Sequence, residues 1–417
     1  MRVIGLDVHR SFAQVAELKD GVLRQRGRLD LVRHKVLEFA RTLGPDDEVV
    51  LEATGNTMAI VRLLKPHAGR VVIANPLQVR VIADAKVKTD RIDAAVLARL
   101  HAAGYLPEVW QPDEATEFLR RQVARRAGIV KGMTRTKNRI HAVLHANLIP
   151  PYQGKLFMAP GRKWLGEQPL AEDERAAVDR WLAALDGMEQ ELADAERALA
   201  SACLGDERIG RLMAIGGINM PVAASVVSAI GDVSRFASAE RLVSYLGLDP
   251  RVRQSGDKPA QHGRISKQGR AHARGMLVEA AWAAAATPGP LHAFFVRVQS
   301  RKGKQVAAVA TARKIAVLAW HLLTKQEDYT WARPALVAMK QRQMQPKAGA
   351  NSRRGGNAAG PTRDYSVKAL RQQERSWVEQ AEKAYTRFVT AWQERPRAKQ
   401  KPATKSSAKP ATGGDVR

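Results

Sequence analysis

The chain has 417 residues, and its 68 Lys and Arg against 41 Asp and Glu give a formal net charge of +27. This excess predicts a polyanionic partner. Nucleic acid is favoured over a membrane, because no apolar run reaches membrane-spanning length and Asp7 stands where a signal peptide would need apolar residues. The single cysteine, Cys203, excludes an intrachain disulfide and a cysteine-based zinc site, which suits a reducing cytoplasm.

The N-terminal part of the chain, to about residue 110, has an α/β pattern. Three short apolar or alternating runs joined by tight turns predict an antiparallel meander at 3–8, 12–18 and 22–29. The elements predicted after them are a helix (32–42), a buried strand (48–55), a helix (56–64), a strand (70–75) and a last helix that begins near 88.

The middle of the chain, from about 113 to 202, has a helical pattern. A helix at 115–148 carries eight Lys and Arg within 120–139, a density and single sign that favour phosphate contact over a merely solvated face. Apolar residues that step by three and four from Val178 to Leu199 predict a coiled-coil seam, and hence oligomerisation. The stretch 150–161 is predicted to be a loop.

The C-terminal part is mostly helical over 206–325. Residues 212–232 predict two helices joined by a glycine turn, which resembles a helix-hairpin-helix. Asn219 stands where that turn usually has its second glycine, and asparagine tolerates left-handed backbone, so the hairpin could survive. A plain packing hairpin stays open as the alternative. The stretch 244–277 is basic and predicted to be loop-rich before it enters a helix. Beyond about 340, only an amphipathic helix at 366–394 is expected to be ordered.

Four acids stand out from this pattern. Asp7 lies within an apolar strand and Glu52 ends another, while Asp90 and Asp93 begin the last helix of the first region. Capping explains the helix pair alone, with Asp90 as N-cap and Asp93 near N3, and Glu52 alone could face solvent. If the four converge they repel one another, and a divalent cation such as Mg²⁺ resolves the repulsion.

The segments GLDVHR, LEATGN and KVKTDRIDAAVLARL resemble the N-terminal half of DEDD-type insertion-sequence transposases, which have a ribonuclease-H-like fold of the RuvC type. FASAERLVSYLGLDPRVRQSGD and RISKQGRAHARGML are similar to the C-terminal half of the same family. The pieces follow the family's order and cover roughly residues 1–325. From the resemblance we expect an α/β RuvC-like domain and a mostly helical C-terminal domain. The sequence pattern adds a helical coiled-coil middle and a disordered basic tail, which lies outside the resemblance.

The resemblance implies roles for particular residues. Asp7, Glu52, Asp90 and Asp93 would form a Mg²⁺-binding catalytic tetrad, and Ser255 would be the nucleophile. A serine before a glycine is ordinarily a turn residue, but this one lies in a cationic stretch where a phosphate could settle. The only nearby histidine, His262, is expected to be an ordinary loop residue. The nucleic-acid contacts are predicted at Arg120, Arg121, Arg125, Arg126, Lys258, Arg264, Lys267, Arg270 and Arg274.

These expectations combine into one functional prediction. The chain would be a transposase or site-specific DNA recombinase of a bacterial cytoplasm that acts on donor and target DNA as a dimer or tetramer. The resemblance implies that a structured RNA guides it. Its predicted domains are 1–110 (catalytic), 111–205 (RNA binding and oligomerisation), 206–330 (serine-bearing) and 331–417 (tail). The alternatives are a junction-resolving nuclease that uses water and has no need of Ser255, and a non-catalytic architectural protein with no metal dependence.

Overall fold

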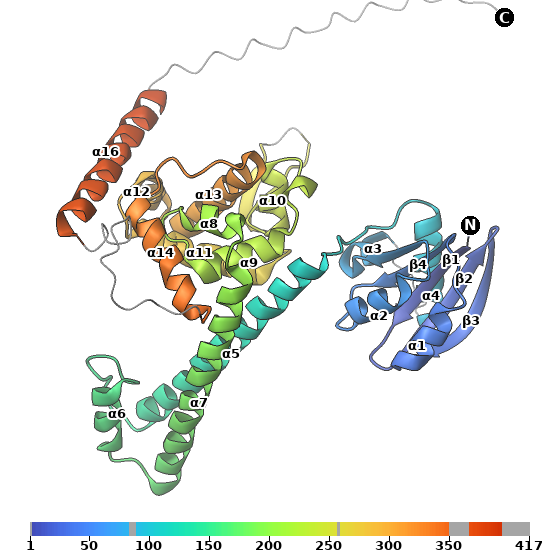
Figure 1. Ribbon diagram of the computed structural model, residues 1–417, viewed down its shortest axis with the longest axis horizontal. Helices are drawn as coiled ribbons and strands as arrows, with labels where there is room; N and C mark the ends of the chain where they lie inside the picture. Colours follow the sequence, from blue (N-terminus) through green and yellow to red (C-terminus); the bar gives the residue numbers. More distant parts are fainter. Residues whose placement is uncertain (1, 83–88, 257–258, 350–366, 394–417) are drawn as a thin grey trace, which may run out of the picture. The chain divides into compact units, whose positions relative to one another are not determined.

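The computed structural model describes residues 2–82, 89–256, 259–349 and 367–393 (Figure 1). The chain divides into two compact units, Met1–Asp113 and Glu114–Arg417.

The first unit is built on a five-stranded sheet with the order β3-β2-β1-β4-β5. β1 (Arg2–Val8), β2 (Phe12–Lys19) and β3 (Val22–Asp30) form the predicted antiparallel meander, with Asp20 and Gly21 in left-handed backbone at the second turn. β4 (Asp47–Glu52) lies parallel to β1, and β5 (Arg70–Ala74) lies parallel to β4. The carboxyl ends of β1, β4 and β5 therefore meet at one edge of the sheet.

Helices cover both faces of this sheet. α1 (Arg33–Ala40) and α2 (Thr57–Leu64) bury the side chains of Leu6, Leu51 and their neighbours on one face. α4 (Asp90–Ala102) covers the other face, where Leu97 and Ala98 lie in one core with Val3 and Val50. The short helix α3 (Pro76–Ile82), which was not predicted, begins at a proline whose fixed φ suits a first helical position.

The second unit begins with two long helices, α5 (Glu114–Ala146) and α7 (Glu172–Cys203). Residues of the predicted seam, including Val178 and Leu185, share a core with Ile129, Met133 and Ile140 of α5. The seam is therefore buried at least partly within the chain. The segment predicted to be a loop ends in a helix, α6 (Ala159–Gly166), because Pro160 initiates a turn that buries Leu165.

The rest of the second unit has a helical core (Figure 1), and its described residues include a two-stranded antiparallel sheet. The stretch predicted to be loop-rich contains the antiparallel strands β6 (Pro250–Arg253) and β7 (Gln261–Ile265); most of their described side chains are exposed, so no apolar alternation signalled them. The helices are α8 (Glu207–Met213), α9 (Met220–Ile230), α10 (Ala239–Tyr245), α11 (Ala271–Ala285), α12 (Pro290–Lys302), α13 (Lys304–Lys325), α14 (Pro334–Lys347) and α16 (Lys368–Gln393), with the 3₁₀ turn η1 (Val233–Arg235).

Helix α13 corrects the expectation that no apolar run reaches membrane-spanning length. It is long and apolar enough to cross a membrane, and half of its most apolar 18-residue window is buried within the protein. Its side chains, Ala312, Ile315 and Ala319 among them, lie in the largest hydrophobic core. A core helix passes the same test of length and composition.

Ordered structure extends into the region predicted to be a tail. Met344 of α14 belongs to the main core, and the predicted amphipathic helix exists as α16. Glu374 accepts a hydrogen bond of 2.8 Å from the backbone N–H of Ala335, and Glu382 accepts one of 2.9 Å from that of Gly289. Residues 350–366 and 394–417, which include the stretch predicted to be disordered, lie outside the described residues.

Candidate metal centre and nucleic-acid interface

The strand register brings Asp7 and Glu52 to the same edge of the sheet. β1 and β4 run parallel with Leu6 opposite Leu51, so Asp7 and Glu52 are the next residues along the two strands. Because side chains alternate between faces, both acids belong to the face of Val3 and Val50, which α4 covers.

Helix α4 places its own acids at this edge. His101, in the last turn of the helix, forms a hydrogen bond with Glu48 near the start of β4. The N-terminus of the helix, with Asp90 and Asp93 in its first turn, therefore lies toward the carboxyl ends of the strands. The side chain of Thr89 accepts a hydrogen bond from the N–H of Ile92, so Thr89 is the N-cap and the prediction of Asp90 as N-cap is wrong. Asp90 is the first residue of the helix, and its carboxylate does not form that cap.

A histidine joins these carboxylates. Nε2 of His9 lies 3.3 Å from Oδ2 of Asp7 and 3.2 Å from Oδ2 of Asp90. The imidazole ring is held by Phe12, whose ring centroid is 4.6 Å away. Asp7, His9 and Asp90 each offer a ligand atom within 4.8 Å of the others, whereas Glu52 and Asp93 are not part of this close group.

The electrostatics of Asp7 reflect the convergence. Burial raises the pKa of the Asp7 carboxyl above its ordinary value, and the negative charges of Asp93 and Asp90 raise it further, while His9 acts in the opposite direction. Asp93 is therefore close enough to be felt at Asp7. Holding several carboxylates at a partly buried edge costs free energy unless a positive charge compensates.

The donor set fits a divalent cation. With metal–ligand bonds of about 2.1 to 2.3 Å, neighbouring donors around an octahedral ion lie about 3.0 to 3.3 Å apart. The distances from Nε2 of His9 to Oδ2 of Asp7 and of Asp90, 3.3 and 3.2 Å, agree with this spacing between neighbouring donors. Two carboxylate oxygens suit Mg²⁺, and an imidazole nitrogen favours a softer ion such as Mn²⁺.

Ser255 lies in the connection between β6 and β7, where Gln254, Ser255 and Gly256 are all exposed. Gly256 has a φ of +59°, which a turn requires. The loop belongs to the second unit, whereas the four acids belong to the first. Lys258 and the side chain of His262 lie outside the described residues.

The four arginines predicted on α5 have different surroundings. Arg126 donates to Glu196 at 2.8 Å, and Arg120 donates to the carbonyl of Ser228 at 2.8 Å, so both are engaged within the protein. Arg121 pairs with Glu117 at 3.1 Å but is exposed, and Arg125 is exposed. Further along the helix, Lys131, Arg135 and Arg139 line one surface depression with Thr134, Asn138 and Ala142.

The other predicted cations flank the β6–β7 hairpin and α11. Arg264 and Lys267 are exposed, and Lys267 has left-handed backbone. Arg274 caps α10 by donating to the carbonyl of Leu246 at 3.0 Å, and Arg270 donates to the hydroxyl of Tyr245 at 2.7 Å.

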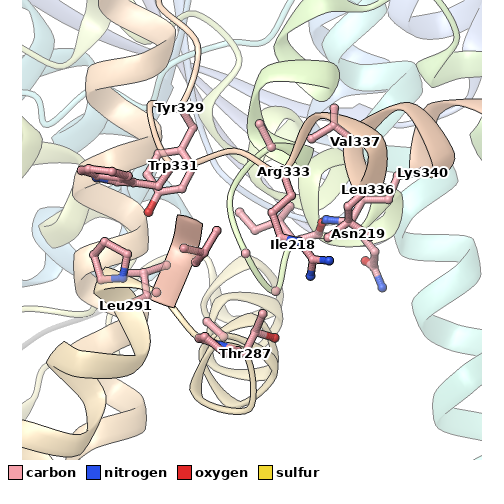
Figure 2. Close-up of a pocket in the computed structure, with 18 residues that line it drawn as sticks. Ile218, Asn219, Thr287, Leu291, Tyr329, Trp331, Arg333, Leu336, Val337 and Lys340 are labelled. Atoms are coloured by element: carbon pink, nitrogen blue, oxygen red, sulfur yellow. The ribbon is translucent and has the colours of Figure 1, made fainter. Parts of the chain in front are cut away.

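The turn between α8 and α9 packs against other parts of the second unit. Asn219 has extended backbone and caps α9 by accepting a hydrogen bond from the N–H of Val222, so it does not use the left-handed conformation that asparagine tolerates. Gly217 is the left-handed residue, and a β-carbon there would lie 2.2 Å from the carbonyl of Ala280. Lys340 donates to the carbonyls of Met213 and Ile218 at this turn, beside a cavity of about 200 Å³ (Figure 2).

Sequence reasoning missed several residues of these sites. His9 stands two positions after Asp7, so its side chain shares the face of Asp7 if the strand pattern continues; this spacing was the available signal. Arg235 stacks on Phe236 and Tyr245, with its guanidinium carbon 4.4 and 4.5 Å from the two ring centroids. Its separation from Arg120 and Arg270 in the sequence gave no sign that the three approach one another.

Comparison with known proteins agrees with this architecture. A family model described as Transposase, of the DEDD type in IS110 elements, matches residues 4–148, and one described as the transposase IS116/IS110/IS902 family matches residues 210–296. The α/β region with its five-stranded sheet, followed by helical regions, is consistent with a DEDD nuclease-like fold.

Named relatives point the same way. A Sinorhizobium fredii protein named as a transposase is 27% identical over 66% of this chain and 65% of its own length, so the chain spans just under two thirds of that relative. The transposase for insertion sequence element IS1111A of Coxiella burnetii is 27% identical over 67% of this chain and 79% of its own length. The pilin gene-inverting protein of Moraxella bovis is 25% identical over 67% of this chain and 81% of its own length. The chain belongs to the IS116/IS110/IS902 family of transposases.

Proposed function

We propose that this transposase cuts and rejoins DNA as a site-specific recombinase, with a metal centre at the edge of the sheet and Ser255 as nucleophile. The observation that carries the proposal is the convergence of Asp7, His9 and Asp90, from β1, the residue after it and the start of α4. A relative is named for inverting a pilin gene, and inversion of a DNA segment requires cutting and rejoining at both ends.

The metal centre would be held by Asp7, Glu52, Asp90 and Asp93, with His9 as a nitrogen donor. A bound divalent ion supplies Lewis acidity that stabilises negative charge on phosphate oxygens. The carboxylates fix its place, and the stacking of His9 on Phe12 holds the imidazole toward it. This arrangement would act on DNA at the open edge of the sheet, where the side chain of Asp90 is 52% exposed.

Ser255 would carry the covalent step. Its Oγ attacks a DNA phosphorus and one P–O bond forms, while the P–O bond to one deoxyribose oxygen breaks. The proton leaves the serine hydroxyl and the departing sugar oxygen accepts a proton. The number of phosphate ester bonds is conserved, so the strand can be rejoined without ATP. Exposed cations on the neighbouring strands, Arg251, Arg253 and Arg264, would stabilise the added negative charge.

The nucleic-acid partners and the assembly belong to the same proposal. The net charge of +27 and the exposed cations of α5 support binding of a structured guide RNA as well as donor and target DNA. Because the acids and Ser255 lie in different units, a dimer or tetramer could complete each site from two protomers. We place this activity in the bacterial cytoplasm, at the nucleoid.

The proposal is tested by DNA cleavage with the full chain, the RNA transcribed from its own element and Mg²⁺ or Mn²⁺. Asp90→Asn and Asp93→Asn should abolish cleavage while nucleic-acid binding persists. The exposed acid Glu38 offers a matched control, and Glu38→Gln should cut like the wild type. Cleavage that persists in both aspartate variants, or that needs no divalent ion, would remove the metal-centre proposal and favour an architectural role.

A further inference from the structure

Three arginines from distant parts of the chain converge on one tyrosine hydroxyl in the second unit. Nε of Arg270 donates to Oη of Tyr245 at 2.7 Å, and Arg120 and Arg235 also interact with this hydroxyl. Burial, and then the positive charges of Arg270 and Arg235, lower the pKa of Arg120 to about 10. Burial would raise the pKa of the Tyr245 hydroxyl, but the charges and hydrogen bonds of Arg270 and Arg235 lower it below its ordinary value.

Clustered guanidinium groups are costly unless a negative charge compensates them. Asp232 is one nearby carboxylate that feels Arg235, but its lowered pKa arises first from hydrogen bonds donated by Ser234. Arg270 donates to the Tyr245 hydroxyl and makes no ion pair with any of the described residues. Its positive charge is therefore available to an anion that enters from solvent.

The cluster borders a surface depression of about 530 Å³ where α5, α9 and the start of α11 meet. Arg120 of α5 and Arg270, the residue before α11, both line it. α11 has 15 residues and no side-chain cap, so the first backbone N–H groups of the helix, at Ala271 and His272, have no capping oxygen. The depression therefore combines the positive charge of two arginines with backbone N–H donors that have no side-chain cap.

A buried hydroxyl marks the same place independently. Ser225 of α9 lines the depression, is only 1% exposed, and its Oγ has no hydrogen-bond partner among the described residues. A polar group buried without a partner costs free energy that an acceptor in the depression would recover.

We infer that this depression is a binding pocket for a phosphodiester group of a nucleic-acid backbone, built by Arg120, Arg270 and the N-terminus of α11. Arg235 and Tyr245 position the guanidinium groups from behind, since Arg235 stacks on the Tyr245 ring and the hydroxyl accepts from Arg270. The inference rests on the proposed function only in assuming that the chain meets nucleic acid. Ser255 follows Tyr245 by ten residues and precedes Arg270 by fifteen, so the pocket and the serine loop belong to one stretch of chain.

The test is a salt titration of binding with the full chain in EDTA, using a DNA duplex in one arm and a folded RNA in the other. Arg270→Gln should weaken binding about 10- to 100-fold, because it removes a charge-assisted hydrogen bond to phosphate, and should reduce the salt slope by about one. Arg241, exposed on α10, is the matched control, and Arg241→Gln should change binding no more than about twofold. The arm in which Arg270→Gln weakens binding identifies DNA or RNA as the source of the phosphate.

A second variant separates a binding role from a structural one. Ala271 is exposed in the first turn of α11, and Ala271→Glu would place a carboxylate in the pocket. The protein should melt at a higher temperature and bind nucleic acid at least tenfold more weakly, two changes that a folding defect cannot produce together. Equal effects of Arg270→Gln and Arg241→Gln, or undiminished binding by Ala271→Glu, would overturn the pocket.

The two proposals fail separately in this experiment. The binding titration needs neither a metal ion nor cleavage. If the wild type never cuts DNA but Arg270→Gln weakens nucleic-acid binding, the recombinase proposal is wrong and the pocket proposal stands. A wild type that cuts DNA while Arg270→Gln and Ala271→Glu bind normally would do the reverse.

Discussion

A β-carbon on Gly5 would lie 2.1 Å from the carbonyl oxygen of Ala94. Such contact is impossible for real atoms, so only glycine lets α4 approach the middle of β1 this closely. The approach has a consequence at the sheet edge, because the same helix carries Asp90 toward Asp7.

Gly5→Ala should therefore act at a distance on the metal centre. The helix must shift, which we expect to cost about 1 to 3 kcal/mol of unfolding free energy and to weaken Mn²⁺ binding in a calorimetric titration. At Gly44 an added β-carbon would meet its nearest atom at 3.7 Å, so Gly44→Ala is a control that should keep metal affinity. Unchanged affinity in Gly5→Ala would show that α4 does not set the site.

Asp7→Asn should stabilise the metal-free protein. Because burial and nearby carboxylates raise the folded-state pKa of Asp7 above 3.8, ionisation costs the folded state free energy. This cost appears as pH rises from about 3.8 through the raised pKa and is fully present at neutral pH. The asparagine variant should melt at a higher temperature than the wild type at pH 7.5 in EDTA, and the difference should shrink toward pH 4. A lower melting temperature at pH 7.5 would contradict this electrostatic account.

His9→Ala should change which metal the protein prefers. Loss of a nitrogen donor should weaken Mn²⁺ binding by about tenfold and Mg²⁺ binding less, because Mg²⁺ prefers oxygen. Mn²⁺ paramagnetic resonance with competing Mg²⁺ measures the preference directly. His34, exposed on α1, provides the control variant His34→Ala. Equal loss of both affinities would mean that His9 only supports the fold.

The five strands and the antiparallel pairing of the first three were predictable from the sequence because their signals are local. Alternating runs, the Asp20–Gly21 turn and apolar stretches mark each strand without knowledge of the rest. The role of Thr89 was missed because Thr, Asp90 and the following residues offer competing caps, and only the backbone decides among them.

The sites depend on contacts that no local pattern encodes. Arg120, Arg235 and Arg270 are separated by more than thirty residues at each step, and their approach follows from the packing of α5, η1 and α11. Likewise, charge density on α5 could be read from the sequence, but the engagement of Arg126 with Glu196 of α7 could not. The β6–β7 hairpin around Ser255 could not be predicted because its strands have little alternation of apolar and polar residues.

The exposed cations of α5 should contact nucleic acid outside the pocket that Arg120 helps to form. Replacing Arg125, Arg135 and Arg139 with Gln should weaken RNA binding and reduce its salt slope by about one for each phosphate that is no longer neutralised. Fluorescence anisotropy over a range of salt concentrations measures both. Arg180, exposed on α7, is the control, and Arg180→Gln should bind normally. A triple variant with wild-type slope would place the RNA on another surface.

The serine mechanism is tested most directly by trapping the covalent intermediate between the protein and DNA. The full chain, its RNA and a divalent ion are incubated with a suicide DNA substrate whose cleaved product cannot religate, and tryptic peptides are mapped. The peptide 254–264, QSGDKPAQHGR, contains Ser255 as its only hydroxyl residue. We predict a protein–DNA adduct on this peptide that is absent in Ser255→Ala and retained in Ser244→Ala, a change at an exposed serine of α10. Cleavage without an adduct, or an adduct on another peptide, would contradict the serine mechanism and leave a nuclease that uses water.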